Sequence, residues 1–155
     1  WIGAGLGAGL GGLLADRMAT KIGYRWGYRL VPMISLPLAG LLLLLAVSTS
    51  APYAAVLALM ATFFMVELNE GPFWAATMRV ARSDTGAATG VLNTGGNFAG
   101  MVSAPVIGAL SGAGNWNATF MLGAAFAFVG AACWLAIDPD RRVATDRRDA
   151  PAAAA

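Results

Sequence analysis

The 155-residue sequence has no histidine, only one cysteine (Cys133) and few charged residues, which make up 12% of the chain. A single cysteine excludes a disulfide within the chain. The lack of histidine excludes a Ser-His-Asp or Cys-His catalytic set and a His/Cys metal site. Soluble domains carry about a quarter charged residues. Because hydrophobic residues instead make up 58%, the composition indicates a membrane protein, for which we expect no cofactor and no metal.

Apolar stretches long enough to cross a bilayer, which takes about 20 residues, occur four times. They cover residues 30–49, 53–78, 86–111 and 118–137. A fifth apolar stretch, residues 1–14, is shorter, and since the chain begins at Trp1 we interpret it as a truncated transmembrane helix. Polar residues 15–29 are expected to form a cytoplasmic loop, and residues 138–155 a disordered cytoplasmic tail. The pattern predicts an all-α membrane protein.

The basic residues support this layout because they occur only in alternate connections. They are Arg17, Lys21, Arg25, Arg29, Arg79, Arg82, Arg141, Arg142, Arg147 and Arg148. Five crossings place all of them on one side, and the positive-inside rule makes that side cytoplasmic. The basic balance is therefore interpreted as a topology signal and not as a nucleic-acid-binding surface. We expect a multi-pass protein of the cell (inner) membrane with a cytoplasmic C-terminus, in contact with the lipid bilayer.

Glycines near the start of the chain match G-x-G-x-x-G, from Gly7 to Gly12. A dinucleotide-binding loop needs a preceding strand and a following helix, whereas this match lies within an apolar helical stretch. A second spacing fits better, because Gly3, Gly7 and Gly11 recur every four residues. Small residues at this spacing allow close approach of transmembrane backbones.

A stripe of mainly small residues follows one face of the helix predicted at 86–111. Its members are Gly86, Gly90, Asn93, Asn97, Gly100, Ala104 and Gly108. The glycines are predicted to serve helix packing. Because an amide in hydrocarbon is costly unless it is hydrogen-bonded, Asn93 and Asn97 should face other helices or water. They either join helices by hydrogen bonds or line a substrate cavity, and both uses are compatible.

Two carboxylates interrupt the apolar stretch 53–78. Glu67 and Glu70 are three residues apart and share a helix face with Trp74. Pro72 lacks an N–H group and clashes with the carbonyl of Leu68, so a kink or local unwinding is expected there. Ionisable residues within membranes are candidates for function, and low-dielectric surroundings favour the neutral carboxyl group. We therefore predict that Glu67 or Glu70 carries a proton; ordinary carboxylates at a wetted helix end are the alternative.

The segment GGLLADRMATK (Gly11–Lys21) resembles the signature loop of the major facilitator superfamily. The matching residues are Gly12, Asp16, Arg17 and Lys21. Ala19 and Thr20 stand where the family has a glycine and a basic residue, as in the weaker copy of the loop after the eighth helix. The resemblance implies the C-terminal helical bundle of a twelve-helix fold, from helix eight to helix twelve, with the N-terminal half missing.

The segment from Glu70 to Leu110 is similar to helices ten and eleven of the anion:cation symporter branch of that superfamily. The matching residues are Trp74, Gly86, Asn93, Asn97, Gly100, Pro105 and Gly108. Members of this branch carry organic anions such as sugar acids and hexuronates, commonly with protons. The resemblance implies that Trp74 and Asn93 line the substrate cavity, and we add Glu70 and Asn97 as candidate substrate-binding residues.

The sequence thus predicts a transporter and not an enzyme: a secondary carrier that takes up an organic anion with a proton or another coupling cation. A major facilitator exporter of drugs or metabolites is the alternative within this class. A non-transporting membrane scaffold or channel subunit is the alternative outside it. The charge layout makes a soluble nucleotide-binding enzyme a remote third class.

Overall fold

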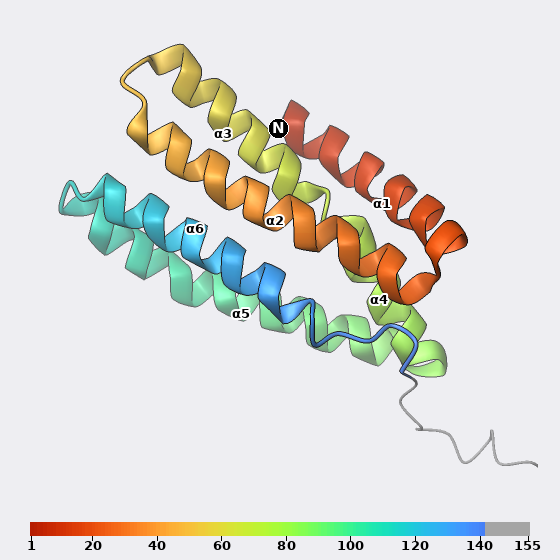
Figure 1. Ribbon diagram of the computed structural model, residues 1–155. Coiled ribbons are helices and arrows are strands. Elements are labelled where there is room, and N and C mark those ends of the chain that lie inside the picture. The colour runs from red at the N-terminus through yellow and green to blue at the C-terminus, as the bar shows by residue number, and fades with distance from the viewer. Residues whose placement is uncertain (142–155) are drawn as a thin grey trace, which may run out of the picture.

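The computed structural model describes residues 1–141, and in this range every regular element is a helix (Figure 1). The α-helices are α1 (Ile2–Ile22), α2 (Tyr24–Ser48), α3 (Pro52–Glu67), α4 (Glu70–Ala81), α5 (Thr85–Gly112) and α6 (Trp116–Cys133), with the 3-10 helix η1 (Arg82–Asp84) between α4 and α5. The all-α prediction is therefore confirmed. Residues 142–155, the greater part of the expected tail, lie outside the described residues.

The polar segment 15–29, expected to be a loop, is helical apart from Gly23. The helix α1 continues to Ile22, and α2 begins at Tyr24. Alanine, methionine, arginine and lysine in this segment are good helix formers, so polarity alone does not end the helix. Gly23 makes the turn with a φ of 88°, a conformation that glycine adopts readily and that other residues rarely do.

Close packing joins α1 to α3 through the glycines spaced by four. A Cβ at Gly3 would lie 2.8 Å from the Met60 carbonyl oxygen; one at Gly7 would meet the Phe64 carbonyl, and one at Gly11 the Leu68 carbonyl. Both series advance by four residues in the same direction, so α1 and α3 run parallel and in register. This confirms that the spacing permits close backbone approach.

The helix α2 lies at the centre, packed against α1, α3 and α6, whereas α5 packs, among the described elements, only against α4, η1 and α6 (Figure 1). The helices α1 and α2, the pair α3 and α4 in line, and the helices α5 and α6 run alternately up and down, so the turns between them gather at two ends (Figure 1). One end holds the α2–α3 and α5–α6 turns. The other holds the α1–α2 turn, η1 and the residues after α6. The described lysine and arginine residues all belong to this second end, which we call the basic end.

By length and composition, three helical stretches of the described chain are suited to crossing a membrane: Tyr24–Ser48, Pro52–Gly112 and Trp116–Cys133. The second has 61 residues and comprises α3, α4, η1 and α5. It reverses direction at η1, where Arg82 has a φ of 49° (Figure 1). It covers residues 53–78 and 86–111, whose use as two separate membrane spans stays a prediction.

A small buried core lies toward the basic end. It consists of Ala15, Ala19, Tyr28, Val31, Leu68, Ala76 and Trp134. Many large apolar side chains elsewhere are exposed, among them Leu41, Phe63 and Phe126. Such extensive apolar exposure is unusual for a soluble monomer and suits helices that contact lipid or further helices.

Candidate functional site

A break divides the helix predicted at 53–78 into α3 and α4. The structure places it at Leu68 and Asn69, which form a turn between the two helices. Pro72, fully buried in the first turn of α4, cannot donate to the Leu68 carbonyl four residues earlier. The break thus falls at the residue that proline chemistry indicates, and broken helices are a common element of transporter binding sites.

The helix α1 accommodates this break because it has two glycines beside it. A Cβ at Gly11 would meet the backbone of Leu68, and a Cβ at Gly71 would meet the backbone of Gly12. Gly12, assigned to the signature loop by resemblance, therefore lies within α1 and against the start of α4. Side chains at these positions would push α1 away from the broken helix.

Glu67 and Glu70 lie on either side of the break, at the end of α3 and the start of α4. Glu67 is half-buried beside Gly7 of α1, whose Cβ would lie 2.9 Å from the Glu67 Cβ. Glu70 is exposed and accepts a 2.9 Å hydrogen bond from the indole Nε1 of Trp74. The structure thus brings Glu70 and Trp74 together.

Asn69, in the break itself, is a polar residue that the sequence analysis did not assign to the site. Its Oδ1 atom is buried, and no donor among the described residues reaches it. A buried acceptor without a donor is costly, and such atoms often mark a functional position. Sequence position alone did not reveal it, because burial of that oxygen depends on how α1 and α4 meet.

Asn93 and Asn97, the other two candidates, lie exposed on α5. The Asn97 Nδ2 atom donates a 2.8 Å hydrogen bond to the Asn93 carbonyl oxygen, which satisfies part of the amide within its own helix. Among the described residues, no hydrogen bond connects either asparagine to Glu70 or Trp74. Their use as cavity lining or as helix-joining groups stays a prediction.

The glycine stripe on α5 has no neighbouring helix within the described structure. A Cβ at Gly86, Gly90, Gly100 or Gly108 would meet no atom within 4 Å, and α5 has no buried residue. In contrast to the α1 glycines, this stripe faces away from the described helices. Its role in close packing stays a prediction that concerns parts of the protein outside the described residues.

The remaining signature-loop residues lie along the last turns of α1. Asp16 accepts a long hydrogen bond, 3.4 Å, from the Tyr28 hydroxyl of α2. Arg17 and Lys21 are exposed. Asp16 therefore joins α1 to α2, while the two basic side chains project from the basic end.

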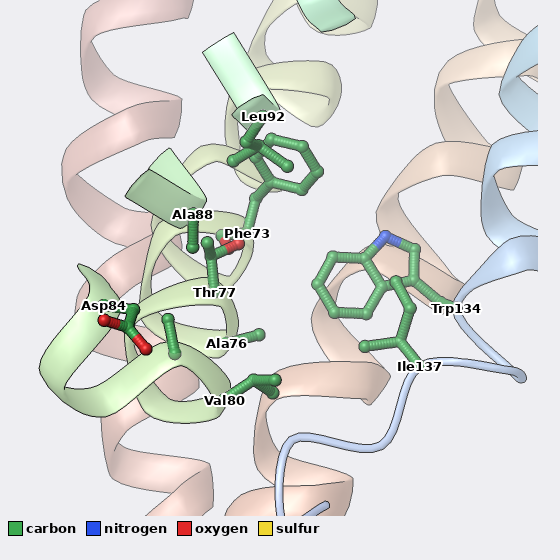
Figure 2. Close-up of a pocket in the computed structure, with 10 residues that line it drawn as sticks. Phe73, Ala76, Thr77, Val80, Asp84, Ala88, Leu92, Trp134 and Ile137 are labelled. Carbon is green, nitrogen blue, oxygen red and sulfur yellow. The ribbon is translucent and has the colours of Figure 1, made fainter. Parts of the chain in front are cut away.

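A cavity of about 350 Å³ lies between α4, the start of α5 and the residues after α6 (Figure 2). Its wall is mostly apolar, with Phe73, Leu92, Trp134 and Ile137, and it includes Thr77 and Asp84. The rings of Phe73 and Trp134 meet edge to face with centroids 6.5 Å apart. Trp74 does not line the cavity but contacts the ring of Phe73, at 6.2 Å between ring centroids.

Comparison with known proteins gives a family and a relative. The family model of the Major Facilitator Superfamily matches residues 1–154. The chain is 38% identical over 105 residues to a protein of Cupriavidus necator described as a probable sulfoacetate transporter, SauU. The match covers 66% of this chain and 24% of that protein, so the chain spans only about a quarter of its relative. No solved structure matches it.

These matches agree with the apolar helices of the described chain. The protein is a multi-pass membrane protein with transmembrane helices, and its all-helical structure is consistent with a fragment of the major facilitator fold. The chain belongs to the Major Facilitator Superfamily.

Proposed function

We propose that the chain is part of a secondary transporter that takes up a small organic anion together with protons. The membrane family and the described relative support transport of such a solute. The relative's name indicates sulfoacetate, and the resemblance to the symporter branch extends the class to sugar acids and hexuronates. We assign the transporter to the inner membrane with a cytoplasmic C-terminus, because the positive-inside rule places the basic end in the cytoplasm.

The observation that carries this proposal is the helix break flanked by two carboxylates. Within a stretch suited to crossing a membrane, Glu70 is held by Trp74 and Glu67 lies against α1. No ion pair connects either glutamate to a basic residue of the described chain. Because ionisable side chains within membrane spans commonly mark proton pathways, we assign proton coupling to one of these two glutamates.

Charge also explains why protons and the anion should travel together. The sequence has no lysine or arginine between residues 30 and 78, so these helices offer an anion no basic side chain. A carboxylate at Glu70 would repel an approaching organic anion, whereas a protonated Glu70 could donate a hydrogen bond to it. In this scheme the basic partner of the anion comes from outside the described residues.

Alternating access supplies the transport mechanism. Two helical bundles would rock around a site near the middle of the membrane, and α5 would present its open face of small residues and asparagines to that site. Trp74, Glu70, Asn93 and Asn97 are assigned to substrate contact, and Glu67 and Glu70 to proton coupling. An exporter of metabolites with the same fold is the alternative, which the direction of transport would distinguish.

Uptake measurements on the complete polypeptide in proteoliposomes test this proposal. Sulfoacetate, a hexuronate and a neutral sugar are supplied with and without an inward proton gradient. We expect the gradient to drive uptake of an anion and not of the neutral sugar, and Glu70→Gln or Glu67→Gln to abolish the stimulation by acid. If both variants keep the pH profile of the parent protein, neither glutamate carries the proton.

A further inference from the structure

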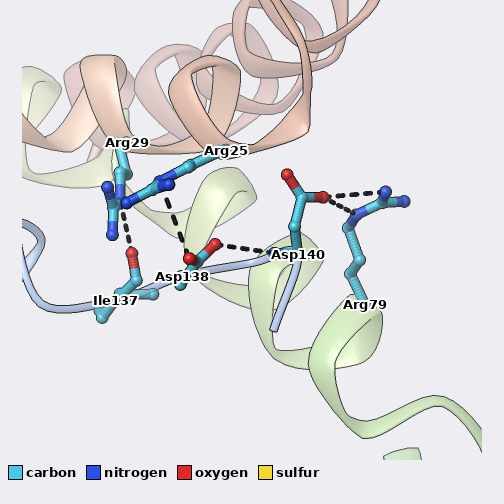
Figure 3. A network of polar contacts seen from close by, with 6 residues as sticks. All are labelled: Arg25, Arg29, Arg79, Ile137, Asp138 and Asp140. Carbon is cyan, nitrogen blue, oxygen red and sulfur yellow. Dashed lines mark hydrogen bonds and ion pairs between the residues drawn. The ribbon is translucent and has the colours of Figure 1, made fainter. Parts of the chain in front are cut away.

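The residues that follow α6 form a segment that crosses the basic end of the helices (Figure 3). We define it as the post-α6 segment, residues 134–140. Trp134 is 3% exposed and belongs to the core, and Pro139 is fully buried. Residues 134–137, expected to end a membrane span, and residues 138–140, expected to start a disordered tail, are thus anchored to the bundle by one buried side chain each.

Arg79, in the last turn of α4, joins that helix to the post-α6 segment. Its Nη2 and Nε atoms donate to Oδ1 of Asp140 at 3.1 and 3.3 Å. The same guanidinium group lies over the ring of Tyr24, 3.5 Å from its centroid. One side chain therefore connects α4 to the start of α2 by a cation–π contact and to the post-α6 segment by an ion pair.

Two arginines of α2 hold the same segment from the other side. Arg25 forms an ion pair with Asp138 at 3.8 Å, and the buried Arg29 donates from Nε to the Ile137 carbonyl. Within the segment, the Asp140 N–H donates to the Asp138 carboxylate at 3.2 Å. This turn directs the carboxylate of Asp138 to α2 and that of Asp140 to α4 (Figure 3).

These contacts matter because they are the polar links between α4 and the segment after α6, beside the apolar contact of Phe73 with Trp134. The helices α4 and α6 do not pack directly against each other within the described structure. The helix α4 is short and is separated from α3 by the break at Leu68 and Asn69. The C-terminal part of α4 borders the 350 Å³ cavity, and the opposite wall of the cavity includes Trp134 and Ile137 of the post-α6 segment.

We propose that Asp138 and Asp140 are positioning residues whose ion pairs clamp the post-α6 segment onto α2 and α4, and that releasing this clamp opens the cavity between α4 and the segment. Through α4, the clamp also fixes Glu70 and Trp74, which lie on the same short helix. The consequence for transport rests on the proposed function, whereas opening of the cavity does not.

Cysteine labelling of Ala76 measures the opening directly. Ala76 lines the cavity and is 4% exposed. In the complete protein with Cys133→Ser, Ala76→Cys should react slowly with a small maleimide. Because partly exposed ion pairs contribute little, we expect Asp140→Asn to raise the labelling rate about two- to fivefold. High salt should raise the rate in the parent protein and raise it less in Asp140→Asn, in which only the Arg25–Asp138 ion pair is left to screen.

Arg82→Gln is the matched control, since it removes a positive charge three residues from Arg79 without removing a described ion pair. It should leave the labelling rate unchanged, and the exchanged pair Arg79→Asp with Asp140→Arg should restore the slow rate. An unchanged rate in Asp140→Asn, or an equal rise in Arg82→Gln, would overturn the clamp. The thermal unfolding midpoint of each variant in detergent shows whether a rise in its labelling rate comes from general loss of folding.

Uptake assays on the same proteins separate the clamp from the proposed function. If the clamp positions Glu70 and Trp74, Asp140→Asn should lower the maximal uptake rate and the exchanged pair should recover it. Faster labelling in a protein whose parent form takes up no anion supports the clamp and contradicts the proposed function. If Asp140→Asn leaves the labelling rate of Ala76→Cys unchanged in a protein that shows acid-driven uptake, the result contradicts the clamp and supports the proposed function.

Discussion

At the scale of single residues, the proposed site rests mainly on the pairing of Glu70 with Trp74. Residues four apart on a helix are neighbours, so their shared face was predictable from spacing. The 2.9 Å hydrogen bond between them adds that the indole orients the carboxylate. An oriented carboxylate presents a defined lone pair to a proton or to a substrate hydroxyl group.

Replacing Trp74 by phenylalanine tests that role, because the ring is largely kept and the N–H donor is lost. Hydrogen bonds to charged groups contribute about 1.5–3 kcal/mol, and this hydrogen bond is exposed, which lowers its contribution. We therefore expect Trp74→Phe to lower kcat/KM for uptake about three- to tenfold, measured as initial rates against anion concentration.

The matched control is Trp116→Phe, which makes the same change at an exposed position at the start of α6. It should leave uptake unchanged. Equal rates for Trp74→Phe and the parent protein would show that the indole donor has no part in transport.

At the scale of helices, the sequence predicted most elements, because their signals are local. Apolar length predicted helices in these stretches, Pro72 located the break, and the spacing of Gly3, Gly7 and Gly11 indicated close packing that α3 provides. The helical course of residues 15–22 was missed, because charged residues with high helix propensity extend a helix beyond its apolar part.

Alanine substitutions within α1 test the parallel, registered packing. A Cβ at Gly11 would meet the Leu68 backbone, which cannot move aside as a flexible side chain can. Overpacking of this kind costs about 1–3 kcal/mol, so Gly11→Ala should lower the thermal midpoint in detergent.

Gly9→Ala is the control on the same helix, since a Cβ there meets no atom within 4 Å. Alanine favours a helix over glycine by up to about 1 kcal/mol, so this variant should be neutral or slightly more stable. Equal destabilisation by both substitutions would contradict the registered contact between α1 and α3.

Contacts between distant residues could not be predicted from local patterns. Arg79 and Asp140 are 61 residues apart, and the sequence shows them only as members of two polar segments. The buried Oδ1 of Asn69 likewise results from packing among helices. For the glycine stripe on α5, the local pattern is regular and was predictable, but the described chain provides no helix that packs against it.

At the scale of the whole molecule, the central claim is that the helices cross the membrane in alternation and leave the basic end in the cytoplasm. The grouping of the turns fits this alternation: the turns near Ser50 and Asn115 lie at one end, and the α1–α2 turn and η1 lie at the other (Figure 1). Proton coupling, substrate access and the clamp are all assigned relative to this orientation.

Labelling of single cysteines in intact cells tests this claim most directly. Ser50→Cys and Lys21→Cys, both at exposed positions, are placed in turn in a Cys133→Ser protein and treated with a membrane-impermeant maleimide. The alternating arrangement predicts that Ser50→Cys reacts in intact cells and that Lys21→Cys reacts only after the membrane is permeabilised. Reaction of both cysteines from the same side would contradict it.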